Sequence, residues 1–204
     1  MSQHLDTAIV PSYTFHLMSD VSADATLNLS SLISRDPSQY EVTGEGLLKP
    51  SQALLEEYGL RLAEPIEWEL EVRSTGGDDD FVLTGWAGGT AVLECRRCLD
   101  EVEVESSSDL VYPMVYRPGT EGLVLLENDD DEEDVLVFGN PEVDFASLIT
   151  QVFAIDLPLT ALCREDCKGL AADGVNLNDH PDHEAPQEEN EAPSPFAVLK
   201  DLEV

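Results

Sequence analysis

Hydrophobic and polar residues alternate in the middle of this chain, and the alternation predicts β-strands. Ile66 to Val72 alternates strictly, with an apolar residue at every second position. The cluster Thr75 to Asp78 is a turn signal, and Phe81 to Trp86 returns toward the first run. A turn signal between two such runs predicts a β-hairpin.

The pattern continues beyond this hairpin with two further strands. Gly88 and Gly89 predict a second turn, residues 90–94 a third strand, and residues 99–114 a fourth strand in which apolar residues alternate with glutamates. Together these runs predict an antiparallel meander over 66–114. Strict alternation leaves one polar sheet face, so only the other face needs to be covered.

One longer segment has the pattern of an amphipathic helix. Pro141 stands at a favourable first position, apolar side chains from Val143 to Ile155 line one broad face, and Pro158 stops the helix. The segment 142–156 is therefore predicted as the main helix, packed against the meander. The combination predicts an α+β fold, and a short helix is also expected at 51–58.

All four cysteines of the chain occur as two close pairs. Cys95 and Cys98 form a C-x2-C pair at the tip between the predicted third and fourth strands, and Cys163 and Cys167 form a C-x3-C pair after the predicted helix. Four thiolates from two tight turns are a ligand set for tetrahedral zinc, at zinc–sulfur distances of about 2.3 Å. The 64 residues between the pairs exceed the spacing of a compact finger. The pattern therefore predicts a cysteine-centred zinc knuckle assembled from distant segments.

Two other states of these cysteines are alternatives to zinc binding. One is reduced thiols without metal, including a redox-active Cys95 and Cys98 pair whose thiol pKa the flanking arginines would lower. The other is disulfides, which suit secreted proteins better. The start of the chain has no signal-peptide pattern, and no apolar run approaches a membrane span of about 18 residues. A cytoplasmic protein without membrane contact is expected.

The chain is strongly acidic, with a net charge of −33 from 43 acidic and 10 basic residues. Seven acids in the eight positions of 127–134 predict a solvated loop between short strands at 122–126 and 135–138. Such a charge repels a nucleic-acid backbone at long range and favours a basic protein partner.

Four of the ten basic residues nevertheless lie within or beside the cysteine pairs. They are Arg96, Arg97, Arg164 and Lys168. A folded site would gather them into one positive island. The island would serve either to contact RNA phosphates or to offset a zinc–tetrathiolate centre, whose formal charge is about −2.

The composition changes after residue 178. Residues 179–195 are mostly Asp, Glu, His, Pro, Gln and Asn, which predicts a disordered acidic linker. Residues 196–204 form a short apolar segment that can dock on its own domain or on a partner. The predicted organisation is one domain over 1–178, followed by this linker and segment.

Several of these motifs occur in the order of a known family. The segments are Glu94-Cys95-Arg96-Arg97-Cys98-Leu99, Val143-Asp144-Phe145, Asp156-Leu157-Pro158-Leu159, Cys163 to Leu170, Asn176-Leu177-Asn178 and Pro195 to Leu202. Over about residues 90–202 the chain resembles the YceD family of large ribosomal RNA subunit accumulation proteins. The resemblance implies a ribosome biogenesis factor that supports accumulation or processing of large-subunit ribosomal RNA. It would bind precursor ribosomal RNA or a basic ribosomal protein, and it would be neither an enzyme nor a receptor for a small molecule.

The chain departs from the family pattern at one place. The family usually continues Cys-Lys-Gly-Leu with Cys-Pro-x-Cys-Gly, whereas Ala171 to Gly174 stands here. A metal would therefore depend on the two cysteine pairs alone, unless His180 and His183 act as ligands. The rival interpretation is a redox protein that uses Cys95 and Cys98, although no thioredoxin-like βαβ pattern precedes them.

Overall fold

The computed structural model describes residues 21–36, 38–77, 79–126 and 134–184. The chain forms two compact units, each built from two separate stretches. Unit 1 takes residues 1–91 and 105–157, and unit 2 takes residues 92–104 and 158–204. The predicted domain over 1–178 thus contains parts of both units, and its status as one domain stays a prediction.

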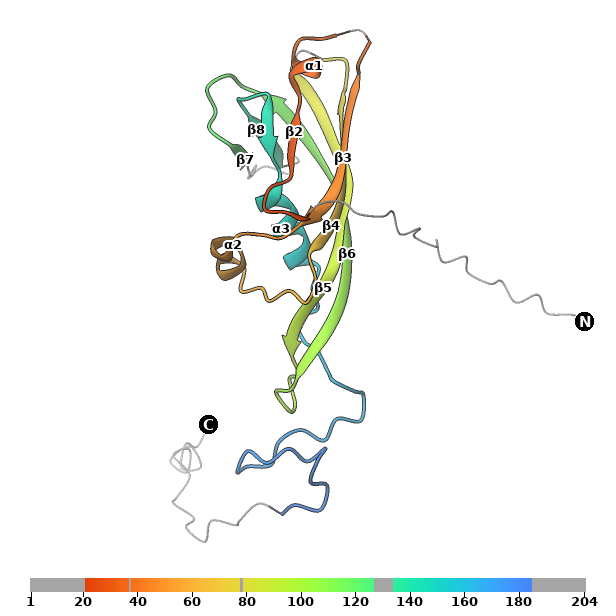
Figure 1. Ribbon diagram of the computed structural model, residues 1–204, viewed down its shortest axis with the longest axis vertical. Helices are drawn as coiled ribbons and strands as arrows, with labels where there is room; N and C mark the ends of the chain where they lie inside the picture. The colour runs from red at the N-terminus through yellow and green to blue at the C-terminus, as the bar shows by residue number, and fades with distance from the viewer. Residues whose placement is uncertain (1–20, 37, 78, 127–133, 185–204) are drawn as a thin grey trace, which may run out of the picture. The chain divides into compact units, whose positions relative to one another are not determined.

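The dominant element is a seven-stranded sheet whose curled central strands are visible in Figure 1. In spatial order its strands are β1 (Val21–Ser22), β3 (Glu41–Leu48), β4 (Ile66–Ser74), β5 (Asp80–Glu94), β6 (Glu101–Tyr116), β8 (Val135–Phe138) and β7 (Leu123–Leu126). Strands β3, β4 and β5 pair antiparallel, whereas β1 pairs parallel to β3 and β8 pairs parallel to β6. The ends of β5 and β6 that flank the first cysteine pair belong to unit 2.

The remaining elements of unit 1 contribute to its hydrophobic core. They are β2 (Thr26–Asn28), α1 (Ser30–Ile33), α2 (Gln52–Glu57), β9 (Glu142–Asp144) and α3 (Ala146–Ile155). Strands β2 and β9 form a separate two-stranded sheet. Phe145, Ile149 and Phe153 are fully buried in one cluster with Ile66 and Leu70 of β4. The inward positions of the alternating strands thus form the core, as the sequence pattern requires.

The predicted α+β fold with one main helix is wrong, because the structure is mostly β. The three helices among the described residues have only four, six and ten residues. The hairpin of the predicted meander is correct: Trp68 pairs with Ala87 and Val72 with Leu83 in an antiparallel ladder. What the prediction lacked is β1 and β3 on one side of that meander and the pairing of β8 and β7 onto its other side, which extend the sheet to seven strands.

Strand β3 escaped prediction because glycines interrupt its alternation. Gly44 and Gly46 lie opposite Leu70 and Trp68 of β4. A Cβ on Gly46 would be 3.3 Å from Cζ2 of the Trp68 indole, and one on Gly44 would overlap Leu27. The large indole therefore occupies space that side chains of β3 would fill, and the hydrophobic signal is lost.

The predicted turn at Gly88 and Gly89 is also wrong. Both residues lie within β5, which runs unbroken for 15 residues. A Cβ on Gly88 would lie 3.1 Å from both Cζ3 of Trp86 and Cβ of Ser107. The absence of a side chain here serves close packing on the sheet rather than a reversal of the chain.

The helix predicted over 142–156 is present but begins later, at Ala146. Residues 142–144 instead form β9, which pairs antiparallel with β2. The Asp144 carboxylate Oδ1 accepts hydrogen bonds from the backbone N–H groups of Ala25 and Ala146, each at 3.0 Å. Asp144 therefore ends the strand and starts the helix.

The shorter predicted elements are largely confirmed. The helix expected at 51–58 is α2, and the strands expected at 122–126 and 135–138 are β7 and β8. The acidic run lies outside the described residues except at its last position, and the linker over 179–195 is described only to residue 184. In the described part of the chain, no helix combines the length and the apolar character needed to cross a membrane.

Candidate metal centre

The first cysteine pair lies in the turn between β5 and β6. The backbone N–H of Cys95 donates to the carbonyl of Asp100 at 2.8 Å, and the N–H of Leu99 donates to the carbonyl of Cys95 at 2.9 Å. Leu99 adopts φ = 63°, in the left-handed region that a tight reversal requires. The turn thereby directs Cys95 and Cys98 into one buried cluster.

The second pair lies in a loop that aligns with this turn. The N–H of Arg96 donates to the carbonyl of Ala161 at 3.0 Å, and the N–H of Leu170 donates to the carbonyl of Arg97 at 3.1 Å. These two bonds hold the stretch that contains Cys163 and Cys167 against the turn of the first pair. All of these residues belong to unit 2.

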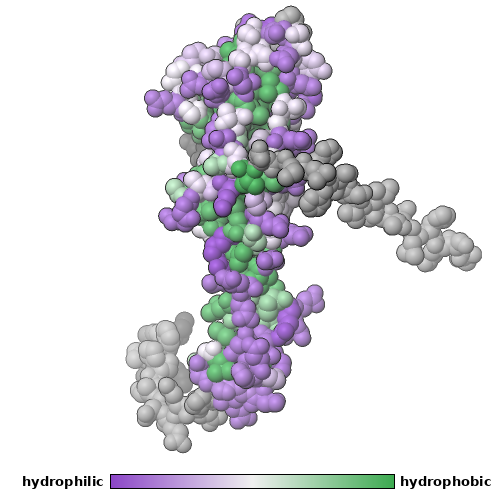
Figure 2. Space-filling view, in the orientation of Figure 1, coloured by the Kyte–Doolittle hydropathy of each residue, from purple (hydrophilic) through white to green (hydrophobic). Residues whose placement is uncertain are grey.

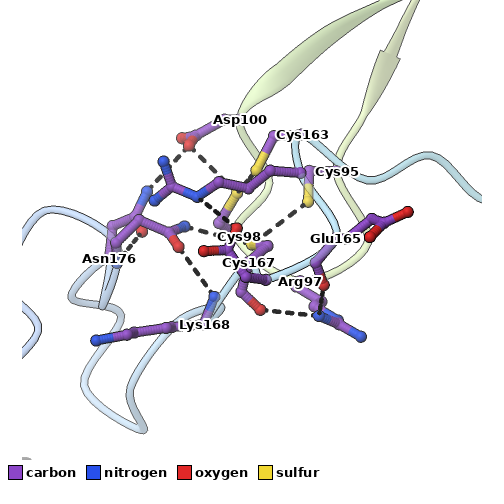
Figure 3. Close-up of polar contacts among 12 residues, drawn as sticks. Cys95, Arg97, Cys98, Asp100, Cys163, Glu165, Cys167, Lys168 and Asn176 are labelled. Atoms are coloured by element: carbon purple, nitrogen blue, oxygen red, sulfur yellow. Dashed lines mark hydrogen bonds and ion pairs between the residues drawn. The ribbon is translucent and has the colours of Figure 1, made fainter.

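The four sulfur atoms lie within 4.8 Å of one another, which confirms the predicted cluster (Figure 3). The Sγ atoms of Cys95 and Cys167 are 3.8 Å apart, and those of Cys98 and Cys163 are 3.5 Å apart. A tetrahedron with zinc–sulfur bonds of about 2.3 Å has edges of about 3.8 Å. All four cysteines are free, and these separations far exceed a disulfide bond of about 2.05 Å. The residues present therefore fit a metal ion.

The four thiols have unequal acidities in this arrangement. A hydrogen bond from the backbone of Cys163, aided by those of Cys98 and Arg97, outweighs burial and lowers the pKa of Cys95 to about 6. Burial raises the pKa of Cys98, and desolvation also raises that of Cys163, although part of this residue faces solvent. The side chain of Asn178 is the main cause of a lowered pKa at Cys167. Amide groups directed at sulfur stabilise thiolates, the form that binds a metal.

Three polar residues around the sulfurs were not identified from the sequence as part of the site. The Cys98 thiol donates to Asp100 Oδ2 at 3.2 Å, and Asn176 Nδ2 donates to the same oxygen at 3.0 Å. Asn178 Nδ2 donates to Cys167 Sγ at 3.3 Å, while its Oδ1 accepts from the backbone N–H of Lys168 at 2.9 Å. The sequence feature that points to the two asparagines is the Asn-Leu-Asn motif. By itself this motif indicates only the family resemblance, not a contact with the sulfurs.

The four basic residues of the predicted island have different environments. Arg97 Nη1 donates to the carbonyls of Glu165 and Cys167 at 3.1 Å and 2.9 Å, so it connects the two cysteine segments. Arg164 Nε lies 3.6 Å from Asp166 Oδ1. All four basic residues, Arg96 and Lys168 among them, are exposed. Contact of these residues with RNA stays a prediction, and Arg97 already has structural partners.

The segment that lacks the family's usual extra cysteines is a small hairpin. The N–H of Gly174 donates to the carbonyl of Ala171 at 2.9 Å, and Gly174 adopts φ = 84°. His183 Nε2 lies 2.7 Å from Asp173 Oδ2, so it braces this turn. Among the described residues, the cluster of possible metal ligands contains neither His180 nor His183.

Similar proteins are known from mycobacteria. A protein of Mycobacterium leprae described as uncharacterized is 29% identical over 127 residues, which are 58% of this chain and 54% of the relative. Proteins of Mycobacterium bovis and Mycobacterium tuberculosis, also described as uncharacterized, are each 24% identical over 164 residues, which are 80% of this chain and 75% of the relative. The chain thus spans about half the length of the Mycobacterium leprae relative. No solved structure matches the chain.

A protein-family model with the description large ribosomal RNA subunit accumulation protein YceD matches residues 83–203. The match covers more than half of the chain and includes both cysteine pairs and the Asn-Leu-Asn motif. It agrees with the resemblance of the cysteine motifs noted in the sequence. The chain therefore belongs to the YceD family of large ribosomal RNA subunit accumulation proteins.

Proposed function

We propose that this protein is a ribosome biogenesis factor that supports the accumulation or processing of large-subunit ribosomal RNA by binding a basic ribosomal protein. Family membership supports a ribosome-related role in general. The observation that carries the choice of partner is the net charge of −33, which attracts a cationic protein and repels RNA. Hydrophilic side chains cover most of the face shown in Figure 2, with hydrophobic patches between them.

In this proposal the four cysteines hold one zinc ion for a structural purpose. A site with four protein thiolates leaves no open coordination position for water or substrate, unlike the site of a zinc enzyme. Bound zinc would supply a cross-link between the hairpin turn and the second cysteine loop. The protein would then act by binding rather than by a reaction of its own, and its cytoplasmic location stays a prediction.

The alternative partner for the same function is precursor ribosomal RNA, which the protein would contact directly. Arg96 and Lys168 favour it, because both are exposed beside the metal centre. Asp100, Glu165 and Asp166 lie in the same segments and are also exposed, which weakens the local positive charge. We therefore rank RNA below a basic protein as the partner.

Binding assays with purified components test the choice of partner. The protein is titrated with individual large-subunit ribosomal proteins and with a fragment of precursor large-subunit ribosomal RNA, at low and at moderate salt. We expect a salt-sensitive complex with at least one ribosomal protein and RNA binding at least about tenfold weaker. Tighter binding to RNA would reverse the ranking. Unchanged large-subunit ribosomal RNA levels in cells that lack the protein would refute the function itself.

Metal content tests the zinc site against the redox interpretation of Cys95 and Cys98. Protein purified without a histidine tag should contain one zinc per chain, and its thiols should react with a thiol reagent only after chelation. Metal-free protein with four readily oxidised thiols would instead support a thiol-based redox protein, which the lowered pKa of Cys95 also favours.

A further inference from the structure

Unit 1 has an open groove of about 620 Å³ on its sheet. The backbone of Gly88 and Gly89 in β5 forms part of its surface, since neither residue has a side chain to fill the space. Ser107 of β6 lies on one side, 3.1 Å from where a Cβ on Gly88 would be. Pro65, in the segment before β4, also lines the groove. The volume is within the range that holds a ligand or several peptide side chains.

The described residues that line the groove include three glutamates and no lysine or arginine. The glutamates are Glu64 in the segment before β4, Glu67 on β4 and Glu105 on β6, and all three side chains are exposed. They come from three separate segments and line one common space. A cation in this space would meet negative charge from more than one side.

Next to the groove, two glutamates on neighbouring strands repel each other. Glu45 of β3 lies directly opposite Glu69 of β4, and both are exposed. Like charges in directly opposite positions destabilise a sheet. A cationic partner on this face would relieve that repulsion, whereas an anionic partner would increase it.

Trp86 adds an aromatic surface to the groove. Its Nε1–H donates to Glu69 Oε2 at 3.2 Å, which fixes the orientation of the indole. The ring lies against Gly88, with Cζ3 3.1 Å from where a Cβ would be. An indole beside carboxylates is a favourable environment for a guanidinium or ammonium group, through cation–π attraction.

We propose that this groove binds an arginine- or lysine-rich segment of a basic protein, with a cationic side chain held by Trp86, Glu67 and Glu105. The proposal rests on the function proposed above and identifies the surface that would recognise the basic partner. The glycines leave room for the backbone of an extended segment, and the carboxylates select its charge.

The full-length protein is titrated calorimetrically with a short peptide of alternating arginine and alanine, and with a glutamine–alanine peptide as the neutral probe. The test variant is Glu67→Gln with Glu105→Gln. The matched control is Glu57→Gln with Glu121→Gln, which removes the same charge from exposed positions outside the groove. We expect the groove variant to bind the arginine peptide about tenfold more weakly and the control variant less than about twofold more weakly.

A third variant tests the groove without removing its acids. Ser107→Lys places a cation at an exposed position of the groove lining. We expect it to weaken peptide binding at least as much as the double glutamine variant, and circular dichroism confirms that each variant is folded. The proposal would be overturned if the groove and control double variants weakened peptide binding equally. It would also be overturned if the unmutated protein bound no arginine peptide, or if it bound the neutral peptide equally well.

The same variants separate this proposal from the general function. If a ribosomal protein binds the unmutated protein and the Glu67→Gln, Glu105→Gln variant equally well, the groove is refuted as its site while the proposed function stands. If the arginine peptide binds in the groove but no ribosomal protein does, the groove is supported and the proposed partner is refuted. A precursor RNA fragment that competes with the peptide at this groove would contradict the assignment of the groove to a basic protein.

Discussion

The side-chain amide of Asn178 donates a hydrogen bond to the sulfur of Cys167, at 3.3 Å from Nδ2 to Sγ. The other end of the same amide accepts from the backbone N–H of Lys168, directly after Cys167. One side chain thus favours the thiolate form of Cys167 and holds this candidate metal ligand in position. Partners of this kind typically change metal affinity by about ten- to a hundredfold when removed.

We therefore expect Asn178→Ala to lower zinc affinity at least about tenfold while leaving unit 1 folded. Competition with a chromophoric chelator measures the affinity. Asn140→Ala is the matched control, because Asn140 is an exposed asparagine in unit 1 and outside the cysteine cluster. Equal affinities of both variants for zinc would show that the Asn178 contact has no role in metal binding.

Replacing Arg97 by alanine should affect zinc retention, whereas replacing its neighbour Arg96 should not. Arg97→Ala removes two hydrogen bonds to carbonyls of the second cysteine loop, so we expect unit 2 to lose about 1 kcal/mol of stability and to release zinc at lower chelator concentration. Arg96→Ala removes an exposed side chain and should leave zinc retention unchanged. Chelator titration of the two variants in parallel makes the comparison. Loss of zinc from Arg96→Ala, with full retention in Arg97→Ala, would contradict these roles.

Zinc binding should depend strongly on pH. Without metal, the raised pKa values of Cys98 and Cys163 keep both thiols protonated near neutral pH, whereas the lowered pKa of about 6 leaves Cys95 largely ionised. Metal binding must displace at least these two protons, so affinity rises with pH by at least about a hundredfold per unit near neutral pH. Calorimetry in buffers of different ionisation heat counts the protons. A release of none would contradict the assignment of Cys98 and Cys163 as ligands.

A glycine in the sheet should be irreplaceable for steric reasons. A Cβ on Gly85 would overlap the backbone carbonyl oxygen of Glu69, which cannot move without breaking the β4–β5 ladder. We expect Gly85→Ala to lower the free energy of unfolding by about 3 kcal/mol. Gly59→Ala is the control, because Gly59 has φ = 62° but no atom within 4 Å of its Cβ position. It should cost only about 1 kcal/mol, as measured by urea unfolding. Equal costs would mean that backbone conformation, not crowding, governs Gly85.

The clustering of the four cysteines was predictable because its signals are local. Two close cysteine pairs force two tight turns, and the alternation before Cys95 placed the first pair at a hairpin tip. The partners of the sulfurs were harder to identify, because asparagine is common in turns for other reasons. Arg97 is an exposed cation, as the sequence suggests, and only the fold brings the carbonyls of Glu165 and Cys167 to its side chain.

The fold class was not predictable from the same signals. Strand β9 pairs with β2 although their partners Val143 and Leu27 are more than 100 residues apart in sequence. No local pattern records such pairing, and the apolar residues of β9 continue smoothly into those of α3. The sequence therefore favoured one longer helix over a strand followed by a short helix.

The discontinuity of unit 2 has a consequence for the order in which the protein is made. Cys95 and Cys98 leave the ribosome first, and 64 further residues must be synthesised before Cys163 follows. Most of that interval is residues 105–157, the second of the two stretches that form unit 1. A nascent chain that stops before Cys163 holds only two of the four candidate sulfur ligands, so a metal that needs all four would bind late in translation, after the residues of unit 1 have been synthesised.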